Sequence, residues 1–100
     1  MREAFIVGAV RTPVGKNRGD LSRLHPNDLG AIALNGLVER TGVDPAQIED
    51  VVMGCVTQTS HQGWNIARLC ALAAGWPVEV PGVRVNCMCG SSQQSLHLAA

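Results

Sequence analysis

Two kinds of apolar pattern alternate along this chain. Residues 4–10 and 51–56 are short, nearly continuous apolar runs, which is the pattern of strands buried on both faces of a sheet. Residues 80–85 end in the period of two that is typical of a strand. Residues 26–40 and 65–74 carry apolar side chains at helical spacing. Strands that alternate with helices predict an α/β fold with a mostly parallel sheet and right-handed crossovers.

Turn-forming and capping residues mark the expected ends of these helices. Gly42 and Gly75 follow the two long helical patterns and predict their ends. Asp44 suits the N-cap of a short helix that begins at Pro45, and Asn65 suits the N-cap of the second long helix. The apolar faces expected of the two long helices are Leu29, Ile32, Ala33 and Leu37 for the first, and Ile66, Leu69, Cys70 and Ala73 for the second.

Composition narrows the range of partners. Lys plus Arg (8) balances Asp plus Glu (8), and the chain has only 3% aromatic residues and no basic run, which argues against a nucleic-acid surface. No apolar run approaches the roughly 20 residues of a membrane span. The N-terminus lacks the apolar core of a signal peptide, so we expect a cytoplasmic protein with free thiols rather than disulfides.

Residues 83–96 carry the candidate chemistry. A strand pattern there gives way to small residues and then to the first turns of a helix, with Cys89 at the junction. A thiol at a helix N-terminus faces unpaired N–H groups and the positive end of the helix dipole, and both favour the reactive thiolate. Cys89 is therefore a candidate nucleophile, although a buried structural thiol is an equal alternative on these grounds. Cys87 lies one residue away without a second cysteine pair, which disfavours structural zinc.

Four segments, taken in order, resemble the N-terminal part of the thiolases, the acetyl-CoA acyltransferase branch of the condensing enzymes. They are AVRTPVGK at 9–16, DVVMGCV at 50–56, NIAR at 65–68 and PGVRVNCMCGSS at 81–92. Thiolases carry Val-Asn, two variable residues and then the nucleophilic cysteine. The resemblance therefore implies that Cys89 is the nucleophile and that Cys87 occupies a variable position. It also implies a thiolase-like layered fold, in which residues 1–100 form part of the N-terminal domain and end within the helix that follows Cys89.

The resemblance implies an activity as well. Cys89 would attack an acyl-CoA thioester and hold the acyl group, which then passes to acetyl-CoA or, in reverse, to CoA. The backbone N–H of Cys89 would help to bind the thioester oxygen as it becomes an oxyanion. CoA thioesters are the implied substrates, with no cofactor, no metal and no membrane partner. A homo-oligomer, dimer or tetramer, is implied too, and the CGSSQQ stretch is closer to degradative thiolases of fatty acid metabolism than to biosynthetic ones.

The chain departs from the family in one respect. Thiolases add a histidine that activates the nucleophile and a second cysteine that acts as acid and base, both far downstream, and His25, His61 and His97 do not match these roles. A polypeptide of these residues alone is therefore predicted to be inactive. Two alternatives stay open: a β-ketoacyl synthase, disfavoured by the Arg-Thr-Pro opening and the Val-Asn-x-x-Cys pattern, and a noncatalytic assembly or lipid-transfer module, disfavoured by the intact nucleophile.

The remaining polar residues and cysteines receive structural interpretations. We expect Cys87 to pack beneath the site, with oxidative pairing through its proximity to Cys89 as the alternative. We also expect Asn86 to hold the turn through its own side chain, and the helix start to be capped by Ser91 and Ser92. Cys55 and Cys70 lie in apolar patterns and are expected in the core. A basic loop would either contact CoA phosphates or, more simply, be solvated; its residues are Arg11, Lys16, Arg18 and Arg23.

Two further groups keep two interpretations each. The polar loop before the second long helix resembles the subunit-contact region of the family, and a plain polar loop is the alternative; its residues are Gln58, Gln62 and Asn65. Trp64 and Trp76 serve either an interface or internal packing, and the pattern does not separate the two.

Overall fold

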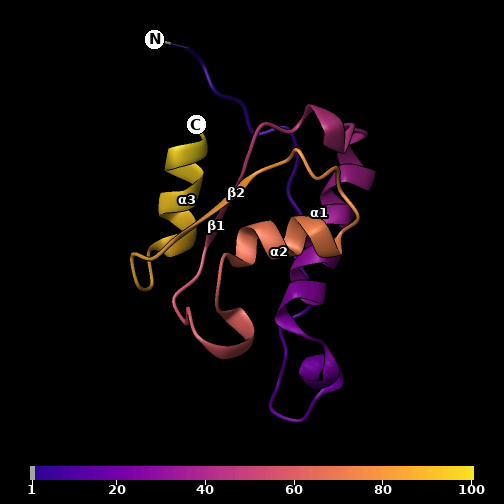
Figure 1. Cartoon of the computed structure of the whole chain (residues 1–100), viewed down its shortest axis with the longest axis vertical. Coiled ribbons are helices and arrows are strands. Elements are labelled where there is room, and N and C mark those ends of the chain that lie inside the picture. The colour runs from indigo at the N-terminus through magenta and orange to yellow at the C-terminus, as the bar shows by residue number, and fades with distance from the viewer. Residues whose placement is uncertain (1) are drawn as a thin grey trace.

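The computed structural model describes residues 2–100 and has a parallel sheet between helical layers. Strand β1 (Val51–Gly54) pairs in parallel with β2 (Gly82–Val85), so that Val51 lies opposite Gly82 and Gly54 opposite Val85. Helix α3 (Ser91–Ala99) covers one face of the sheet, and α2 (Ile66–Ala73) covers the other, with α1 (Pro26–Thr41) packed against α2 (Figure 1). The predicted α/β class and the parallel pairing are confirmed.

Two glycines show why the layers approach so closely. A Cβ on Gly82 would lie 2.6 Å from the Arg68 nitrogen in α2, and a Cβ on Gly54 would lie 2.5 Å from the Ser92 nitrogen in α3. Because Gly82 and Gly54 occupy opposite faces of the pleated sheet, the two contacts fall on opposite sides. The backbones of α2 and α3 therefore rest directly on the strands.

The helix ends fall where the sequence places them. Gly42 and Gly75 follow α1 and α2 with φ of 72° and 77°, the left-handed conformation that glycine adopts without steric cost. Asp44 caps the short 3-10 helix Pro45–Gln47 by accepting a hydrogen bond from the Ala46 N–H. Asn65 caps α2 by accepting from the Arg68 N–H. Two further 3-10 turns, Asp20–Arg23 and Ser60–Gln62, lie in the loops.

The buried faces of the helices are rotated from the expected ones. In α1, Ile32 is 53% exposed, and Ala31 is buried instead. In α2, Ala67 and Ala71 are buried together with Ile66 and Cys70, whereas Ala73 is exposed. The reason is that α2 is covered on two sides, by the sheet and by α1, so its small residues point into the contacts. The main core cluster is Val51, Ala67, Ala71, Trp76 and Val80.

The expected strand at residues 4–10 is wrong for the described chain. This segment runs extended but forms no strand, and Phe5, Ile6 and Val7 are each about three-quarters exposed. Within residues 2–100, β1 and β2 pair only with each other, and an apolar run does not become a strand without a backbone partner. Arg40 nevertheless anchors the end of the segment, because its Nη1 donates to the Ala9 oxygen at 2.7 Å.

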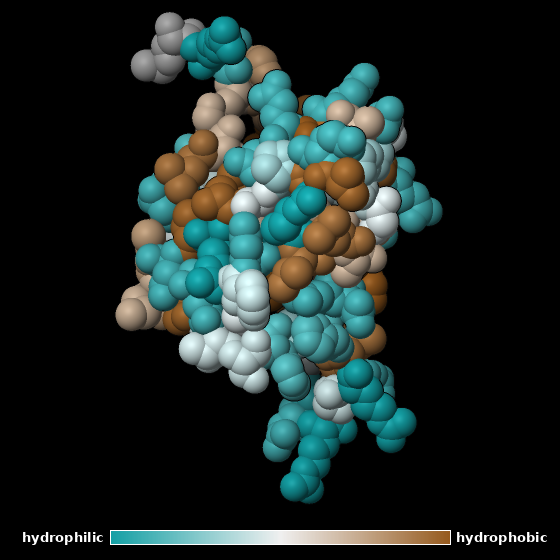
Figure 2. All heavy atoms as spheres, in the orientation of Figure 1, coloured by the Kyte–Doolittle hydropathy of each residue, from teal (hydrophilic) through white to brown (hydrophobic). Residues whose placement is uncertain are grey.

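Apolar side chains also remain on the surface of α3 and along the extended segment. The face shown in Figure 2 carries several apolar patches among polar side chains. Leu96 and Leu98 in α3 are 53% and 57% exposed, and the end of α3 lines a small hollow together with Phe5 and Ile6. Among residues 2–100, none of the helices combines the length and the apolar character needed to cross a membrane.

Candidate active site

Cys89 lies at the carboxyl end of the sheet, directly before a helix. Strand β2 ends at Val85, and Cys89 precedes Gly90, the N-cap residue of α3. Its side chain is exposed and its thiol is free. The predicted strand-to-helix junction is confirmed, and ligand sites in open α/β sheets gather at this end of the strands.

The turn that carries Cys89 is tight and locally strained. Met88 adopts φ of 50°, a left-handed conformation that is uncommon for a non-glycine residue. Two hydrogen bonds close the turn around it, from the Gly90 N–H to the Cys87 oxygen at 3.0 Å and from the Ser91 N–H to the Met88 oxygen at 3.1 Å. Residues 87–90 thus form a tight turn that carries the exposed Cys89 directly before α3.

Two side chains hold this turn. The Asn86 side-chain oxygen accepts from the Met88 N–H at 2.9 Å, as predicted. The Ser91 hydroxyl accepts from the Cys87 N–H at 2.9 Å and donates to the Met88 oxygen at 2.6 Å. Ser91 is only 4% exposed, so these bonds are shielded from water. The turn is therefore fixed on both sides of Met88.

The predicted capping role of Ser91 and Ser92 is wrong. Gly90 is the N-cap residue and makes no side-chain cap bond. Ser91 is already the first residue of α3, so its hydroxyl reaches back to the preceding turn rather than forward to the helix N–H groups. The sequence could not distinguish these roles, because serine is favoured both in turns and at helix starts.

Gly54 packs against the backbone at the start of α3, next to the turn, and was not among the candidate site residues. A Cβ at Gly54 would lie 2.5 Å from both the Ser91 carbonyl carbon and the Ser92 nitrogen. Any larger residue would push the start of α3, and with it the Cys89 turn, away from β1. The signal that identifies such a position is a glycine inside a β-branched strand, which marks close backbone approach.

The start of α3 offers hydrogen-bond donors near the thiol. The N–H groups of Ser92 and Gln93 fall in the first turn, where no intrahelical acceptor exists, and the helix dipole adds partial positive charge there. Among residues 2–100, no oxygen accepts a hydrogen bond from the N–H of Cys89 itself. The N–H of Cys89 and those at the start of α3 are therefore available as donors to an oxygen bound in the site.

The other three cysteines divide into two classes. Cys55 and Cys70 are buried, as predicted. Burial raises the pKa of the Cys70 thiol to about 11, and the neighbouring Cys55 and Asp28 add to this effect. Cys87 is exposed, which corrects the expectation that it packs beneath the site. It lies beyond the end of β2, and no element of the described chain covers it.

The three histidines lie elsewhere. His97 is in the last turn of α3, whereas Cys89 precedes that helix. His25 and His61 contact each other, with ring centroids 5.1 Å apart, where the start of α1 meets a loop. His25 caps α1 through Nδ1, which accepts from the Asn27 N–H at 3.1 Å. None of the three joins the turn that carries Cys89.

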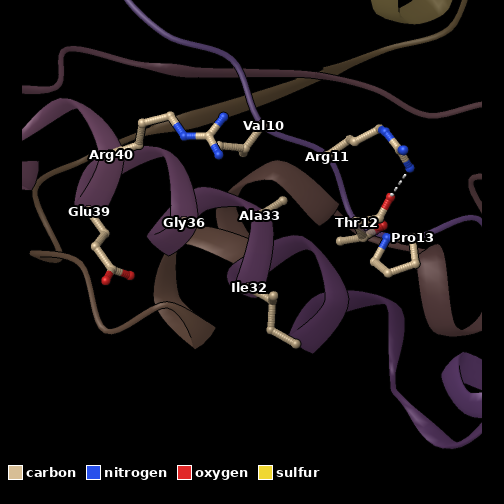
Figure 3. Close-up of a pocket in the computed structure, with 9 residues that line it drawn as sticks. All are labelled: Val10, Arg11, Thr12, Pro13, Ile32, Ala33, Gly36, Glu39 and Arg40. Carbon is tan, nitrogen blue, oxygen red and sulfur yellow. Dashed lines mark hydrogen bonds between the residues drawn. The ribbon is translucent and has the colours of Figure 1, made fainter.

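The basic residues of the first loop form no common site with Cys89. A hollow of about 580 Å³ lies between the N-terminal segment and α1, lined by Arg11 and Arg40 among others (Figure 3). The Arg11 guanidinium bends back to donate to the Thr12 oxygen at 3.3 Å. Arg18 and Arg23 line a separate hollow, and Lys16 is exposed. The side chains of this loop's four basic residues are exposed, and their contact with CoA phosphates stays a prediction.

The two tryptophans have different surroundings, and Asn65 of the polar loop has a structural role. Trp76 is buried, and its Nε1 donates to the Asn35 side chain at 3.0 Å, which is a packing role. Trp64 is 88% exposed and adopts φ of 57°. Asn65 both caps α2 and donates to the Gly82 oxygen at 2.6 Å, so its role is structural. Gln62 lies beside the Cys55 sulfur, at 3.6 Å.

Comparison with known proteins gives a consistent result. The family model described as "Thiolase, N-terminal domain" matches residues 4–100. A steroid 3-ketoacyl-CoA thiolase of Mycobacterium tuberculosis is 55% identical over 100 residues, which is all of this chain and 25% of that protein. A beta-ketoadipyl-CoA thiolase of Acinetobacter baylyi is 46% identical over 101 residues, again covering all of this chain and 25% of that protein.

A solved structure agrees with the sequence matches. The crystal structure of the Bacillus anthracis acetyl-CoA acetyltransferase superposes with a TM-score of 0.87 at 36% identity, covering 94% of this chain and 24% of that one. The chain thus spans about a quarter of the length of the relatives it matches. With the fold, the family model and the relatives in agreement, the chain belongs to the thiolase family, and its residues 4–100 match the N-terminal domain of that family.

Proposed function

We propose that this chain supplies the nucleophile of an acyltransferase that moves acyl groups between CoA thioesters. The observation that carries the proposal is the position of Cys89. Its side chain is exposed in a turn that side-chain hydrogen bonds hold in place, between a parallel strand and a helix N-terminus. Family membership supports the assignment, because the names of the relatives describe thiolases that act on CoA esters. The substrate class proposed for this chain is therefore an acyl-CoA.

In the condensation direction, the first step is the attack of the Cys89 sulfur on the thioester carbonyl carbon of an acyl-CoA. The carbonyl oxygen gains negative charge and accepts hydrogen bonds from the N–H of Cys89 and from the donors at the start of α3. The carbon–sulfur bond to CoA then breaks, CoA leaves as a thiol after taking a proton, and an acyl-Cys89 thioester remains.

In the second step, another molecule accepts the acyl group. The carbanion of acetyl-CoA as acceptor completes a condensation. In thiolysis, the reverse direction, the Cys89 sulfur attacks the 3-keto carbon of a 3-ketoacyl-CoA, the bond between C2 and C3 breaks, and the carbanion of acetyl-CoA leaves and takes a proton. CoA then accepts the acyl group from Cys89. Both directions need groups that move protons, and the three histidines of this chain do not contact the turn. We propose that the proton-transfer groups of the active site come from outside residues 1–100.

The proposal is tested by thiolysis of acetoacetyl-CoA with the complete protein that carries this chain. Cys89→Ser should lose thiolysis by several orders of magnitude, because a hydroxyl is a far weaker nucleophile than a thiolate. Cys87→Ser is the matched control and should retain activity. Unchanged thiolysis in Cys89→Ser would remove the cysteine from this role.

A β-ketoacyl synthase is the competing enzyme class, and the donor thioester separates the two. The proposal expects rapid acylation of Cys89 by acetyl-CoA and no requirement for an acyl-carrier protein. Acylation by an acyl-carrier-protein thioester alone would favour the synthase. A protein that is acylated by neither donor would favour the noncatalytic assembly or lipid-transfer module.

We also propose that the complete protein is a homo-oligomer and that Trp64 contributes to the contact between subunits. Trp64 is 88% exposed in a loop where Ser60 and Trp64 both adopt left-handed backbone conformations, and tryptophan is enriched in interface hot spots. We expect sedimentation analysis of the complete protein to give a lower association constant between subunits for Trp64→Ser, a variant in which Trp76 is unchanged. An unchanged association constant would refute this role.

A further inference from the structure

A second exposed thiol lies beside the candidate nucleophile. Cys87 and Cys89 are both free and exposed, and only Met88 separates them. Cys55 and Cys70, in contrast, are buried in the core. The acyl-transfer chemistry proposed above uses Cys89 and assigns nothing to Cys87.

The backbone brings the two cysteines close together. The hydrogen bond from Gly90 N–H to the Cys87 oxygen, at 3.0 Å, makes residues 87–90 a β-turn in which Cys89 is the third residue. Consecutive Cα atoms are about 3.8 Å apart, so residues two apart in a turn are separated by roughly 5–6 Å. Disulfides have Cα separations of about 4.4–6.8 Å.

The turn also holds Cys87 in place independently of its side chain. The Cys87 N–H donates to the buried Ser91 hydroxyl, and the Cys87 oxygen accepts from Gly90. The sulfur of Cys87 carries none of these bonds. It is therefore free to react while its backbone keeps it next to Cys89.

We propose that Cys87 is a resolving thiol, which forms a reversible disulfide with Cys89 when the site meets a peroxide. This inference rests on the proposed function, because it assumes that Cys89 is the more reactive thiolate of the pair. The pair would switch off acyl transfer under oxidation and protect the nucleophile from irreversible damage.

The chemistry balances in two steps. The Cys89 thiolate attacks one oxygen of the peroxide, the O–O bond breaks, hydroxide leaves, and Cys89 becomes a sulfenic acid. The Cys87 thiol then loses its proton and attacks the Cys89 sulfur, forming the S–S bond and expelling hydroxide. Protonation gives two waters in total, the two sulfurs together lose two electrons, and the peroxide gains them. A dithiol reductant reverses the reaction by thiol–disulfide exchange.

The sequence allows a direct test by mass spectrometry. Trypsin cleaves after Arg84, and residues 85–100 contain no Lys or Arg, so both thiols fall in one peptide. Cys55 and Cys70 fall in the separate peptides 41–68 and 69–84, which serve as internal controls. The complete protein is treated with hydrogen peroxide, its remaining thiols are alkylated, and the digest is compared with and without prior dithiothreitol.

The expected product is a peptide that begins at Val85, lacks two hydrogens and takes up no alkylating reagent at Cys87 or Cys89. Thiolysis activity should fall with the same time course and return with dithiothreitol. In Cys87→Ser, peroxide should instead drive Cys89 to the sulfinic or sulfonic acid, and dithiothreitol should restore little activity. Cys55 and Cys70 should stay reduced throughout.

Three outcomes would overturn the inference: Cys87 still open to alkylation after Cys89 is oxidised, a disulfide with a different cysteine, or equal recovery of the wild type and Cys87→Ser. The proposed function fails separately, through a missing acyl adduct on Cys89 in unoxidised protein. An acyl adduct without a disulfide would leave acyl transfer standing and the resolving role refuted.

Discussion

At the scale of single residues, the hydroxyl of Ser91 makes two of the hydrogen bonds that hold the Cys89 turn. It bonds to the backbone on both sides of Met88 and is nearly buried. Ser91→Ala should leave the Cys87 N–H and the Met88 oxygen without this partner and lower the free energy of unfolding by about 1–3 kcal/mol. Denaturant unfolding of the complete protein measures the change.

The neighbouring serine provides the control for this prediction. Ser92→Ala removes the same atom from an exposed side chain, and its effect should stay within about 0.5 kcal/mol. Acylation of Cys89 should slow in Ser91→Ala and not in Ser92→Ala, because only the former loosens the turn. Equal losses of stability in the two variants would show that Ser91 has no special role.

Cys70 makes stability depend on pH in the alkaline range. Its pKa is about 11 in the folded protein, against an ordinary value of 9.0, because burial disfavours the thiolate. The unfolded chain therefore releases this proton first as the pH rises. The thiol's contribution to stability is complete below pH 9 and declines between pH 9 and pH 11.

The Cys70→Ala variant tests the direction of this pH dependence. The free energy of unfolding, measured against pH, should fall less steeply in the variant than in the wild type across that window. The side chains that titrate alike in both proteins cancel in the comparison. If the free energy of unfolding changed with pH by the same amount in both proteins, the proposed effect of Cys70 ionisation would be contradicted, even if the variant were less stable at every pH.

Residue identity alone gave part of the site. Cys89 at the junction and the turn-holding Asn86 could be predicted, because both depend on local sequence. The role of Gly54 could not, since it arises from a contact between β1 and α3, which are separated by more than thirty positions in the chain. The role of Ser91 is local, but serine is favoured both in turns and at helix starts, so the sequence did not separate the two. The exposure of Cys87 likewise depends on what covers the turn.

At the scale of elements, the contact between α1 and α2 depends on Gly30. A Cβ at that position would overlap the Cys70 sulfur, which is fully buried. Gly30→Ala should therefore force α1 away from α2 and lower the free energy of unfolding by about 1–3 kcal/mol, despite alanine's better helix propensity.

Gly36 in the same helix is the matched control. A Cβ there meets nothing within 4 Å, so Gly36→Ala should stabilise the protein by about 0.5–1 kcal/mol through helix propensity alone. Thermal or denaturant unfolding should give opposite signs for the two variants. A stabilising Gly30→Ala would mean that the close packing of α1 on α2 is not required.

Secondary structure followed the sequence where local signals were sufficient. The caps Asp44 and Asn65 and the glycines at 42 and 75 set helix ends within their own turns. The inward faces of α1 and α2 did not follow, because the neighbours of a helix decide which side is buried. Residues 4–10 failed as a strand for the same reason, since strand pairing needs a distant partner.

At the scale of the whole molecule, the proposed site is incomplete within these residues. The turn provides a nucleophile and hydrogen-bond donors, but none of the three histidines contacts it. A polypeptide of these 100 residues alone should show no thiolysis of acetoacetyl-CoA, with a complete thiolase assayed in parallel as the positive control. Measurable CoA-dependent thiolysis by the short polypeptide would contradict this.

The most direct test of the central claim is the site of acylation. The complete protein is incubated with acetyl-CoA, quenched in acid and digested with trypsin, and the peptide that begins at Val85 is sequenced by mass spectrometry. An acetyl group on Cys89, removed on addition of CoA, is the predicted result. An acetyl group on Cys87 or any other residue, or no covalent adduct, would contradict the assignment of Cys89 as the nucleophile.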